Sequence, residues 1–329
     1  MTEMPSPPVD FSLRPNKAVE RKLIFEALAS LRPLIDWREY QYIGFGALWF
    51  RDFLLAHRLL HIVEMHSIEV KSDIAARARA SRPLKCISVH RGLASSVLLR
   101  PQLRLREKRS IVWLDFYDTA TASTLADLDT LCRDLPVGSV AIMTLNADPR
   151  KFGDRRTAAE ARLRELFGDW VPAVPPAEYF SQAPGQFPKR LSELVWARAL
   201  RTVSDAGRDL VALFNFAYKD GAPMITVGGI VASEQQKRSF QIHETRKHLG
   251  VLRTGRVDTS GGWPCLVEQY LVQLPVLTRL ERLRLNRELP GNLSATTVEK
   301  LCGHPLSADE REAYSKFFGH YPTYAEIDL

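Results

Sequence analysis

Short apolar segments alternate with longer amphipathic segments over most of the chain. Each short segment is rich in β-branched and aromatic residues, and together they predict five β-strands, at residues 40–45, 61–69, 85–89, 111–115 and 137–145. The amphipathic segments predict helices at residues 16–31, 47–60, 70–81 and 125–135. Strands that alternate with helices in this way are typical of stacked β-α-β units. We therefore expect an α/β fold with an open, mostly parallel, twisted sheet and helices on both faces.

The pattern changes after the fifth strand. Helical spacing continues at 154–167 and 191–202, on either side of a proline-rich link at 171–188. Two apolar runs, 209–218 and 224–231, then flank a five-residue loop that contains Asp220-Gly221, which predicts a closing antiparallel β-hairpin.

The last third of the chain, residues 232–329, has weaker patterns. It holds a basic, helix-like run at 235–249, a strand signal at 265–274 and an arginine-rich run at 279–287. The sequence Ser307-Ala-Asp-Glu310 has the spacing of a capping box and predicts the start of a helix. We treat this part as a C-terminal extension of unclear role.

Composition supports a globular protein. The chain has 329 residues, of which 45% are hydrophobic, enough for a full core. No apolar run approaches the length of a membrane span, and the first 15 residues are proline-rich and polar, which predicts a flexible tail and a cytoplasmic protein. The four cysteines lack paired spacing, so we expect reduced thiols rather than a zinc site or a disulfide framework.

The net charge of +7 permits an anionic partner without requiring one. Basic residues gather in two stretches, Arg100–Arg109 and Lys237–Arg256. Such clusters can follow the phosphates of a nucleic acid. A solvated face or a protein-binding surface explains them equally well, because neither stretch contains the aromatic residues that stack on single strands.

Candidate chemistry lies just past the predicted strands, since ligands of open α/β sheets bind at the carboxyl ends of the strands. Gly44 and Gly46 follow the first strand and open a helix-like segment. Glu69 ends the second strand, 23 residues beyond Gly46, close to the offset at which an acid binds a ribose hydroxyl in dinucleotide-binding units. The alternative role of Glu69 is that of a carboxylate at the positive end of the next helix.

Polar residues also follow the later strands: His90-Arg91 after the third, Asp115-Phe-Tyr-Asp118 after the fourth, and Asn146-Ala-Asp148 after the fifth. The oxygen atoms of the last two groups are of the kind that holds magnesium or calcium. Asn and Asp before Pro149 are equally expected in an ordinary turn, which is the interpretation we prefer, and we predict no metal site.

With these motifs the chain resembles the Rossmann-fold S-adenosylmethionine-dependent methyltransferases. The resemblance covers roughly residues 35–231 and rests on the glycine turn Tyr42-Ile-Gly-Phe-Gly46, on Glu69, on Asp115 and on the terminal hairpin. It implies a methyltransferase-type domain at residues 16–231, with S-adenosylmethionine as cofactor. The cofactor-binding residues it implies are Tyr42, Gly44, Gly46, Glu69 and Asp115.

Three positions differ from the family pattern. Tyr42 stands where the glycine motif usually starts with an acid, and Ala47-Leu48 stand where a third glycine is usual. His90-Arg91 replace the acid that often follows the third strand, and Asp115-Phe-Tyr-Asp118 lacks the two prolines of the amino-methylating enzymes.

Methyl transfer needs little covalent machinery from the protein, because alignment of donor and acceptor supplies much of the rate. Asp118, or its neighbour Tyr117, is the residue we expect to orient or deprotonate the acceptor.

Three hypotheses remain at this point. The first is a methyltransferase-like enzyme that acts on an unidentified acceptor. The second is a non-catalytic protein of the same fold that binds a protein or nucleic-acid partner. The third, a nicotinamide-dependent dehydrogenase, is disfavoured by the closing hairpin and by the missing third glycine.

Overall fold

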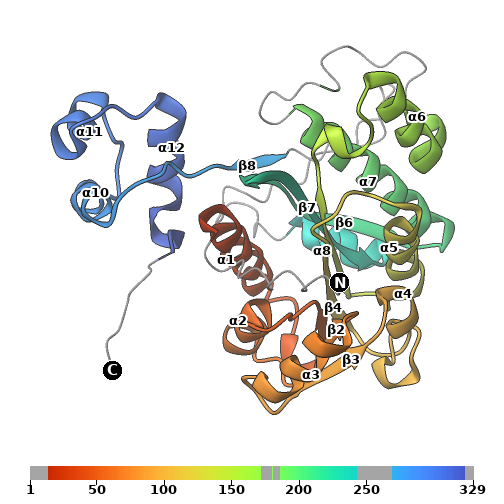
Figure 1. Cartoon of the computed structure of the whole chain (residues 1–329). Coiled ribbons are helices and arrows are strands. Elements are labelled where there is room, and N and C mark those ends of the chain that lie inside the picture. Colours follow the sequence, from red (N-terminus) through yellow and green to blue (C-terminus); the bar gives the residue numbers. More distant parts are fainter. Residues whose placement is uncertain (1–13, 172–179, 181–185, 243–268, 323–329) are drawn as a thin grey trace, which may run out of the picture.

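One mixed sheet of eight strands forms the centre of the molecule (Figure 1). The computed structural model describes residues 14–171, 180, 186–242 and 269–322. The strand order is β3-β2-β1-β4-β5-β7-β6-β8. The first five strands pair in parallel, β7 runs antiparallel to β5 and β6, and β8 is parallel to β6. The strands are β1 (Gln41–Gly44), β2 (Met65–Glu69), β3 (Ile87–Arg91), β4 (Ser110–Asp115), β5 (Val140–Asn146), β6 (Asp209–Asp220), β7 (Ala222–Ala232) and β8 (Tyr270–Val272).

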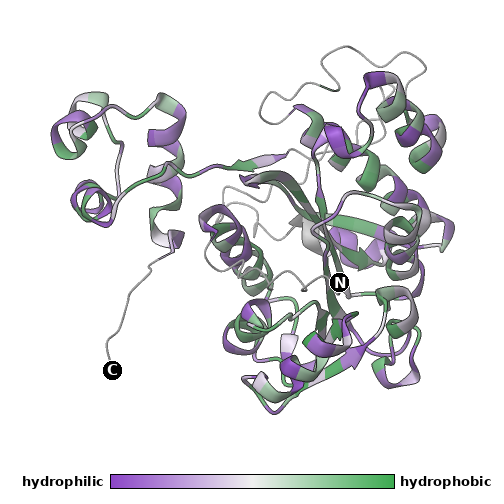
Figure 2. Ribbon diagram, in the orientation of Figure 1, coloured by the Kyte–Doolittle hydropathy of each residue, from purple (hydrophilic) through white to green (hydrophobic). Residues whose placement is uncertain are grey.

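Helices cover both faces of this sheet. One face carries α1 (Pro15–Ser30), α2 (Arg51–Leu60) and α3 (Ser72–Ser81). The other carries α4 (Ala94–Val97), α5 (Ala122–Asp134), α6 (Arg156–Phe167) and α7 (Gln186–Asp205). Figure 2 shows apolar strands at the centre and helices whose outer faces are polar. The layers therefore confirm the predicted open, mostly parallel α/β fold with a closing hairpin.

Several predicted boundaries were wrong by a few residues. The second strand begins at Met65, because His57–Leu60 continue α2 and His61 is its left-handed C-cap. The third strand runs to Arg91, so His90 and Arg91 lie inside it rather than after it. Asn146 is likewise the last residue of β5. For β3 and β5, the end of the strand is set by pairing with neighbouring strands, which a local pattern does not contain.

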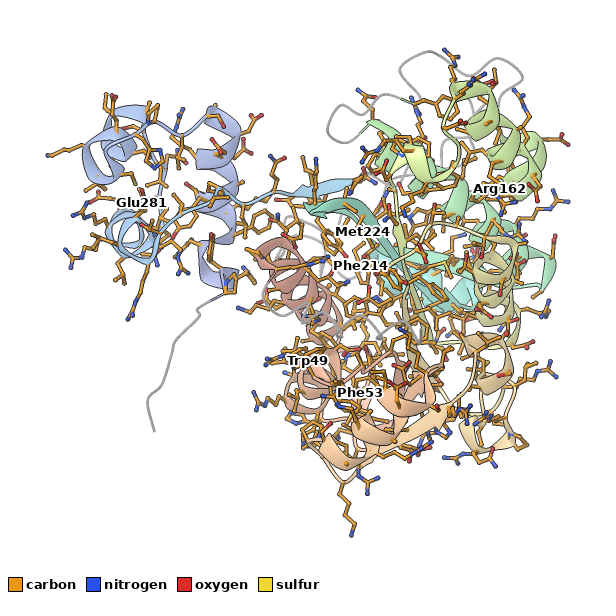
Figure 3. The ribbon with its side chains drawn as sticks, viewed as in Figure 1. Trp49, Phe53, Arg162, Phe214, Met224 and Glu281 are labelled. Atoms are coloured by element: carbon orange, nitrogen blue, oxygen red, sulfur yellow. The ribbon has the colours of Figure 1, made fainter. Side chains whose placement is uncertain are left out.

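The hairpin loop is much shorter than predicted. The two strands pair as far as Asp220 and Ala222, so only Gly221 lies between them, with a positive φ of 107°. A left-handed conformation of this kind favours glycine. A bulge between Ala212 and Phe214 interrupts the pairing further along. The ring of Phe214, which is labelled in Figure 3, occupies the space where Gly228 would carry a Cβ.

The sequence pattern suggested that the glycine turn after β1 leads directly into a helix. In the structure it does not. The strand ends at Gly44 and α2 begins only at Arg51. Ala47 and Phe50 have positive φ angles of 45° and 49°, which an α-helix does not contain. These two residues fold the connection back so that the Phe50 ring is fully buried beneath the turn.

The C-terminal residues divide between the sheet and a small helical cluster. β8 adds a strand to the sheet beside β6. Beyond it, α10 (Arg279–Leu285), α11 (Ala295–Cys302) and α12 (Ala308–Phe317) surround a small core of their own at one side of the molecule (Figure 1). The predicted capping box is confirmed, because Ser307 and Glu310 bond each other's backbone N–H at the start of α12. Between β7 and β8, α8 (Glu234–Ile242) matches the described part of the basic run.

Three cysteines of the described part, Cys86, Cys132 and Cys302, are free thiols, and Cys265 lies outside it. Within the same residues, no helix combines the length and the apolar character that a membrane crossing requires. The predicted division into a tail, a domain at 16–231 and an extension at 232–329 stays a prediction.

Candidate functional site

Strand register places three predicted site residues at one edge of the sheet. Gly44 on β1 pairs with Ser67 on β2 and with Trp113 on β4. Glu69 and Asp115 each lie two residues further along their strands, at the carboxyl ends, with Gly46 between them in the chain that leaves β1. Since side chains two residues apart point to the same face, both acids lie on the face that carries α1 and α2.

Glu69 is the simpler of the two acids. It is partly exposed, and the one hydrogen bond that its carboxylate makes among the described residues comes from the Lys71 backbone N–H, at 3.0 Å. The bond fixes one oxygen at the start of α3 and leaves the other able to accept from a ligand. In the strand register, Glu69 of β2 lies opposite Arg91 of the neighbouring strand β3.

The glycine turn is tightly packed against the protein itself. A Cβ at Gly46 would lie 2.5 Å from the Phe50 ring and 2.8 Å from Ser67 Oγ, so no larger residue fits there. The Gly46 N–H donates to Ser67 Oγ at 3.1 Å. A Cβ at Gly44 would lie 3.2 Å from the Trp113 carbonyl oxygen and 3.3 Å from Asp52 Oδ2. Packing within the protein therefore accounts for both glycines, whether or not a ligand is bound.

Tyr42 lies beneath the turn rather than at the edge. Its ring is fully buried against Phe53, and its hydroxyl donates to Asp52 Oδ2 at 2.6 Å. Burial raises the pKa of the Asp52 carboxyl, against the opposing effects of Arg21 and of the Tyr42 hydrogen bond. The acid missing from the glycine motif thus has a counterpart in Asp52, which reaches the same region from α2.

Asp115 is part of a charged cluster that extends into the core. Its Oδ1 accepts from the Lys17 ammonium of α1 at 2.8 Å, and 29% of the Asp115 side chain is exposed. Lys17 itself is 4% exposed, with its Nζ 3.3 Å from Glu20 Oε2. The Glu20 side chain is completely buried.

The state of Glu20 follows from this position. Burial raises the pKa of its carboxyl, Lys17 opposes the increase, and the nearby Asp115 carboxylate adds to it. Neither Glu20 oxygen has a hydrogen-bond partner of good geometry within the described residues. Lys17 therefore lies close to two acids, Glu20 and Asp115, and its ammonium donates its hydrogen bond to Asp115 at the edge of the sheet.

Sequence reasoning missed Lys17, Glu20 and Asp52. A signal was present for the first two, because Lys17 and Glu20 share a helical face with Ile24 and Leu28, which are core residues. Charged residues in the apolar register of a helix indicate buried charges that need partners.

Asp118 lies in the loop that follows β4 and its side chain is exposed. Its carbonyl oxygen accepts from the Asn146 N–H at 3.0 Å, which ties the loop to β5. Tyr117 is 71% exposed. Phe45 and Phe116, from the chain ends of β1 and β4, form an edge-to-face pair with centroids 5.1 Å apart beside these residues.

Asn146 and Asp148 form an ordinary turn. The Asn146 side chain accepts from the Asp148 N–H, and Asp148 caps the short helix at Pro149–Lys151 while it binds the Arg150 guanidinium. That hydrogen bond is the main reason why the pKa of Asp148 is lowered. In the described ranges, no group of three or more His, Cys, Asp or Glu side chains has the arrangement of a metal site.

His90 and His66 bond each other across β3 and β2, with His66 Nδ1 3.0 Å from His90 Nε2. Burial lowers the pKa of both imidazoles, that of His90 to about 4 with a further contribution from His66. The histidine pair therefore lies within the paired strands β2 and β3 and not after the third strand, where the sequence pattern had placed His90.

Residues 9–329 match the model of a family described as "Putative O-methyltransferase". The chain belongs to this family. No curated protein matches it significantly. Family membership and fold confirm the predicted methyltransferase class, and they identify no acceptor.

Solved structures show the same fold. The chain is similar to Trm1 from Pyrococcus horikoshii, solved with S-adenosyl-L-methionine, at 13% identity and a TM-score of 0.51, over 93% of this chain and 76% of that one. It also matches an O-methyltransferase from Bacillus cereus in complex with SAH at 14% identity, over 68% of this chain and 92% of that one, with a TM-score of 0.36. At 13% identity the likeness to Trm1 is one of fold alone.

Proposed function

We propose that this protein is an S-adenosylmethionine-dependent methyltransferase whose cofactor binds at the carboxyl ends of β2, β1 and β4. The observation that carries the proposal is the strand register, because it brings Glu69 and Asp115 to the same edge and the same face of the sheet with the glycine turn between them. Neighbouring strands lie about 4.8 Å apart, so two strand spacings separate the acids by roughly 10 Å. That span suits a nucleoside at one end and a reacting group at the other.

The residues present fit the cofactor in their chemistry. Glu69 offers a free carboxylate oxygen to the ribose hydroxyls, and Asp115, paired with Lys17, places a partly exposed side chain beside the sulfonium end. Because Gly44 and Gly46 carry no side chains, a ligand could approach the backbone of the turn closely. Tyr42 supports the turn through its hydrogen bond to Asp52. When bound, S-adenosylmethionine supplies an electrophilic methyl group.

The remaining work of the chain is alignment and proton handling. The loop after β4, held to β5 by Asn146, would border the acceptor, and Asp118 would accept the proton that the acceptor loses. Phe45 and Phe116 would exclude water from one side of the reacting atoms. The acceptor itself is unidentified.

Calorimetric titration with S-adenosylmethionine and S-adenosylhomocysteine tests the proposal. We expect saturable binding, and a loss of at least tenfold in affinity in Glu69→Ala, since a charge-assisted hydrogen bond is removed. Asp73→Asn is the matched control, because it removes the charge of an exposed acid in the first turn of α3. A folded protein that gives no heat with millimolar ligand would disprove the proposal.

A second candidate is a non-catalytic member of the family. The crowded turn favours it, because the Gly46 N–H is already bonded to Ser67 and the Phe50 ring fills the space beneath. The same titration separates the two candidates, since a member without cofactor would not bind either ligand.

The predicted partner surfaces stay predictions. Of the first basic stretch, Arg104 and Lys108 bind Glu64, and Arg106 binds Asp134, which leaves less free charge for phosphates. Of the second stretch, residues 243–256 lie outside the described part, and Lys237 binds Asp209 at 2.8 Å. A mobility-shift assay at increasing salt tests nucleic-acid binding, because phosphate contacts weaken as salt rises. A cytoplasmic location also stays a prediction.

A further inference from the structure

The Lys17 ammonium is a buried cation placed beside the reacting end of the candidate site. The first turn of α1, which carries it, is held from two sides. Asp220 of β6 accepts from the backbone N–H groups of Asn16 and Lys17, at 3.3 and 2.7 Å, and Asn16 Oδ1 accepts from the Leu274 N–H at 2.8 Å. The position of Lys17 is therefore set by the fold and not by its own flexible stem.

Burial of a lysine is costly unless the charge is compensated. Here the compensation comes from several groups at once. Nζ bonds Asp115, lies 3.3 Å from Glu20, and stands over the rings of Trp113 and Tyr218 at 4.7 and 5.3 Å from their centroids. Glu20 alone could have served as the counter-ion inside the core. The bond to Asp115 instead joins the buried cation to the acid that faces the ligand edge.

This geometry bears on the reaction, and the inference rests on the proposed function. In methyl transfer the sulfur–carbon bond breaks and its electron pair stays on sulfur, so a cationic sulfonium becomes a neutral thioether while the acceptor bonds the methyl carbon. A bare carboxylate beside the sulfur would stabilise the charged donor more than the transition state, in which that charge is already falling, and would slow the step.

We infer that Lys17 is a specificity-determining residue: by neutralising Asp115 it prevents the site from preferring the cationic methyl donor over the neutral thioether product. Lys17 acts through Asp115 and touches neither ligand. Its removal is expected to leave a net negative charge at the edge, and removal of Asp115 a net positive one.

The experiment compares the affinities of S-adenosylmethionine and S-adenosylhomocysteine, measured by calorimetry at pH 8 in low salt. The charged and titratable groups that face Asp115 are Lys17, Glu20 and Arg21 of α1, Asp52 of α2, Tyr42 of β1 and Tyr218 of β6. Since each variant changes the charge of the Lys17–Asp115 pair, a change in preference reports that charge.

Lys17→Met should shift the preference toward S-adenosylmethionine by about thirtyfold, from Coulomb's law at roughly 8 Å and an effective dielectric constant of about 20. Asp115→Asn should shift it by a similar factor toward S-adenosylhomocysteine. The double variant restores the charge balance and should return the preference to the wild-type value. Lys22→Met is the control, because Lys22 lies on the same helix but bonds the His320 carbonyl oxygen.

The outcomes separate the two proposals. If the folded wild-type protein binds neither ligand, the proposed function is disproved, and this inference, which rests on it, is disproved as well. If both ligands bind and neither single variant changes their ratio by more than twofold, the inference alone is overturned. Should Lys17→Met not fold, Asp115→Asn decides by itself, since its partly exposed side chain is replaced by an isostere.

Discussion

The two acids at the edge of the sheet occupy opposite kinds of environment. Glu69 ends β2 with one backbone hydrogen bond and no ion pair among the described residues, so its carboxylate is free to meet a ligand. Asp115 ends β4 as the outermost member of a cluster that runs through Lys17 to the buried Glu20. In the proposed site this difference would separate recognition from electrostatics: Glu69 is proposed to bind the cofactor, and Asp115 with Lys17 is proposed to set the charge. Four predictions test this division.

The largest effect is expected from Lys17→Ala. It removes the buried cation, leaves Glu20 and Asp115 without their counter-ion and opens a gap between Trp113 and Tyr218. Loss of one partner of a buried ion pair costs about 3 kcal/mol of the free energy of unfolding. Urea denaturation at pH 7 measures it. A cost below about 1 kcal/mol, the range of surface ion pairs, would show that the cluster carries little of the stability.

Tyr42→Phe should have the next largest effect on stability. It removes the hydroxyl that donates to Asp52 and keeps the ring in its contact with Phe53. A buried hydrogen bond to a carboxyl group contributes about 1.5–2 kcal/mol. The same denaturation experiment measures the loss. Tyr117→Phe, at an exposed position of the loop after β4, is the matched control and should leave stability unchanged.

Glu69→Gln should leave stability within about 0.5 kcal/mol of wild type, as expected for a partly exposed position without an ion pair. It should weaken binding of S-adenosylhomocysteine by about tenfold, since a charged acceptor becomes a neutral one. Denaturation and calorimetry on the same preparation supply both values. A stability loss comparable to that of Lys17→Ala would erase the distinction between the two sides.

Asp127 is a reference position on the opposite face of the sheet, where the smallest effect is expected. On α5, burial alone raises the pKa of its carboxyl from 3.8 to about 6. Because the folded state holds the proton more tightly, the stability that this proton provides is complete below pH 3.8 and is lost as the pH rises through 6. Asp127→Asn should therefore stabilise the protein by about 1 kcal/mol at pH 8, after allowance for partial solvation, and not at all at pH 3.

Unfolding at both pH values checks this prediction. An equal gain at pH 3 and pH 8 would mean that packing, rather than charge, explains the change. Asp129→Asn is a useful contrast on the same helix. Asp129 binds the Arg198 guanidinium at 2.6 Å, so its substitution should destabilise the protein.

Much of the fold was predictable because strands that are buried on both faces are apolar over most of their length, as residues 111–114 and 140–143 are. The glycine turn and Glu69 were found for the same reason: both stand at a strand end that the local pattern marks. Boundaries such as those of β3 and β5 were missed, since strand ends depend on the neighbouring strand. The five-residue hairpin loop was also wrong, because Lys219 and Pro223 pair with each other across the turn.

The sequence alone determined the order of strands and helices, the closing hairpin and the acids that end β2 and β4, because each depends on residues close together in the chain. Tertiary structure decided what those acids can do. Lys17 meets Asp115 across 98 residues and Asp220 fixes the first turn of α1 across 203, so the charge of the site depends on contacts that no local window contains. Spacing can locate a carboxylate, but its electrostatic state depends on which buried groups the fold brings beside it.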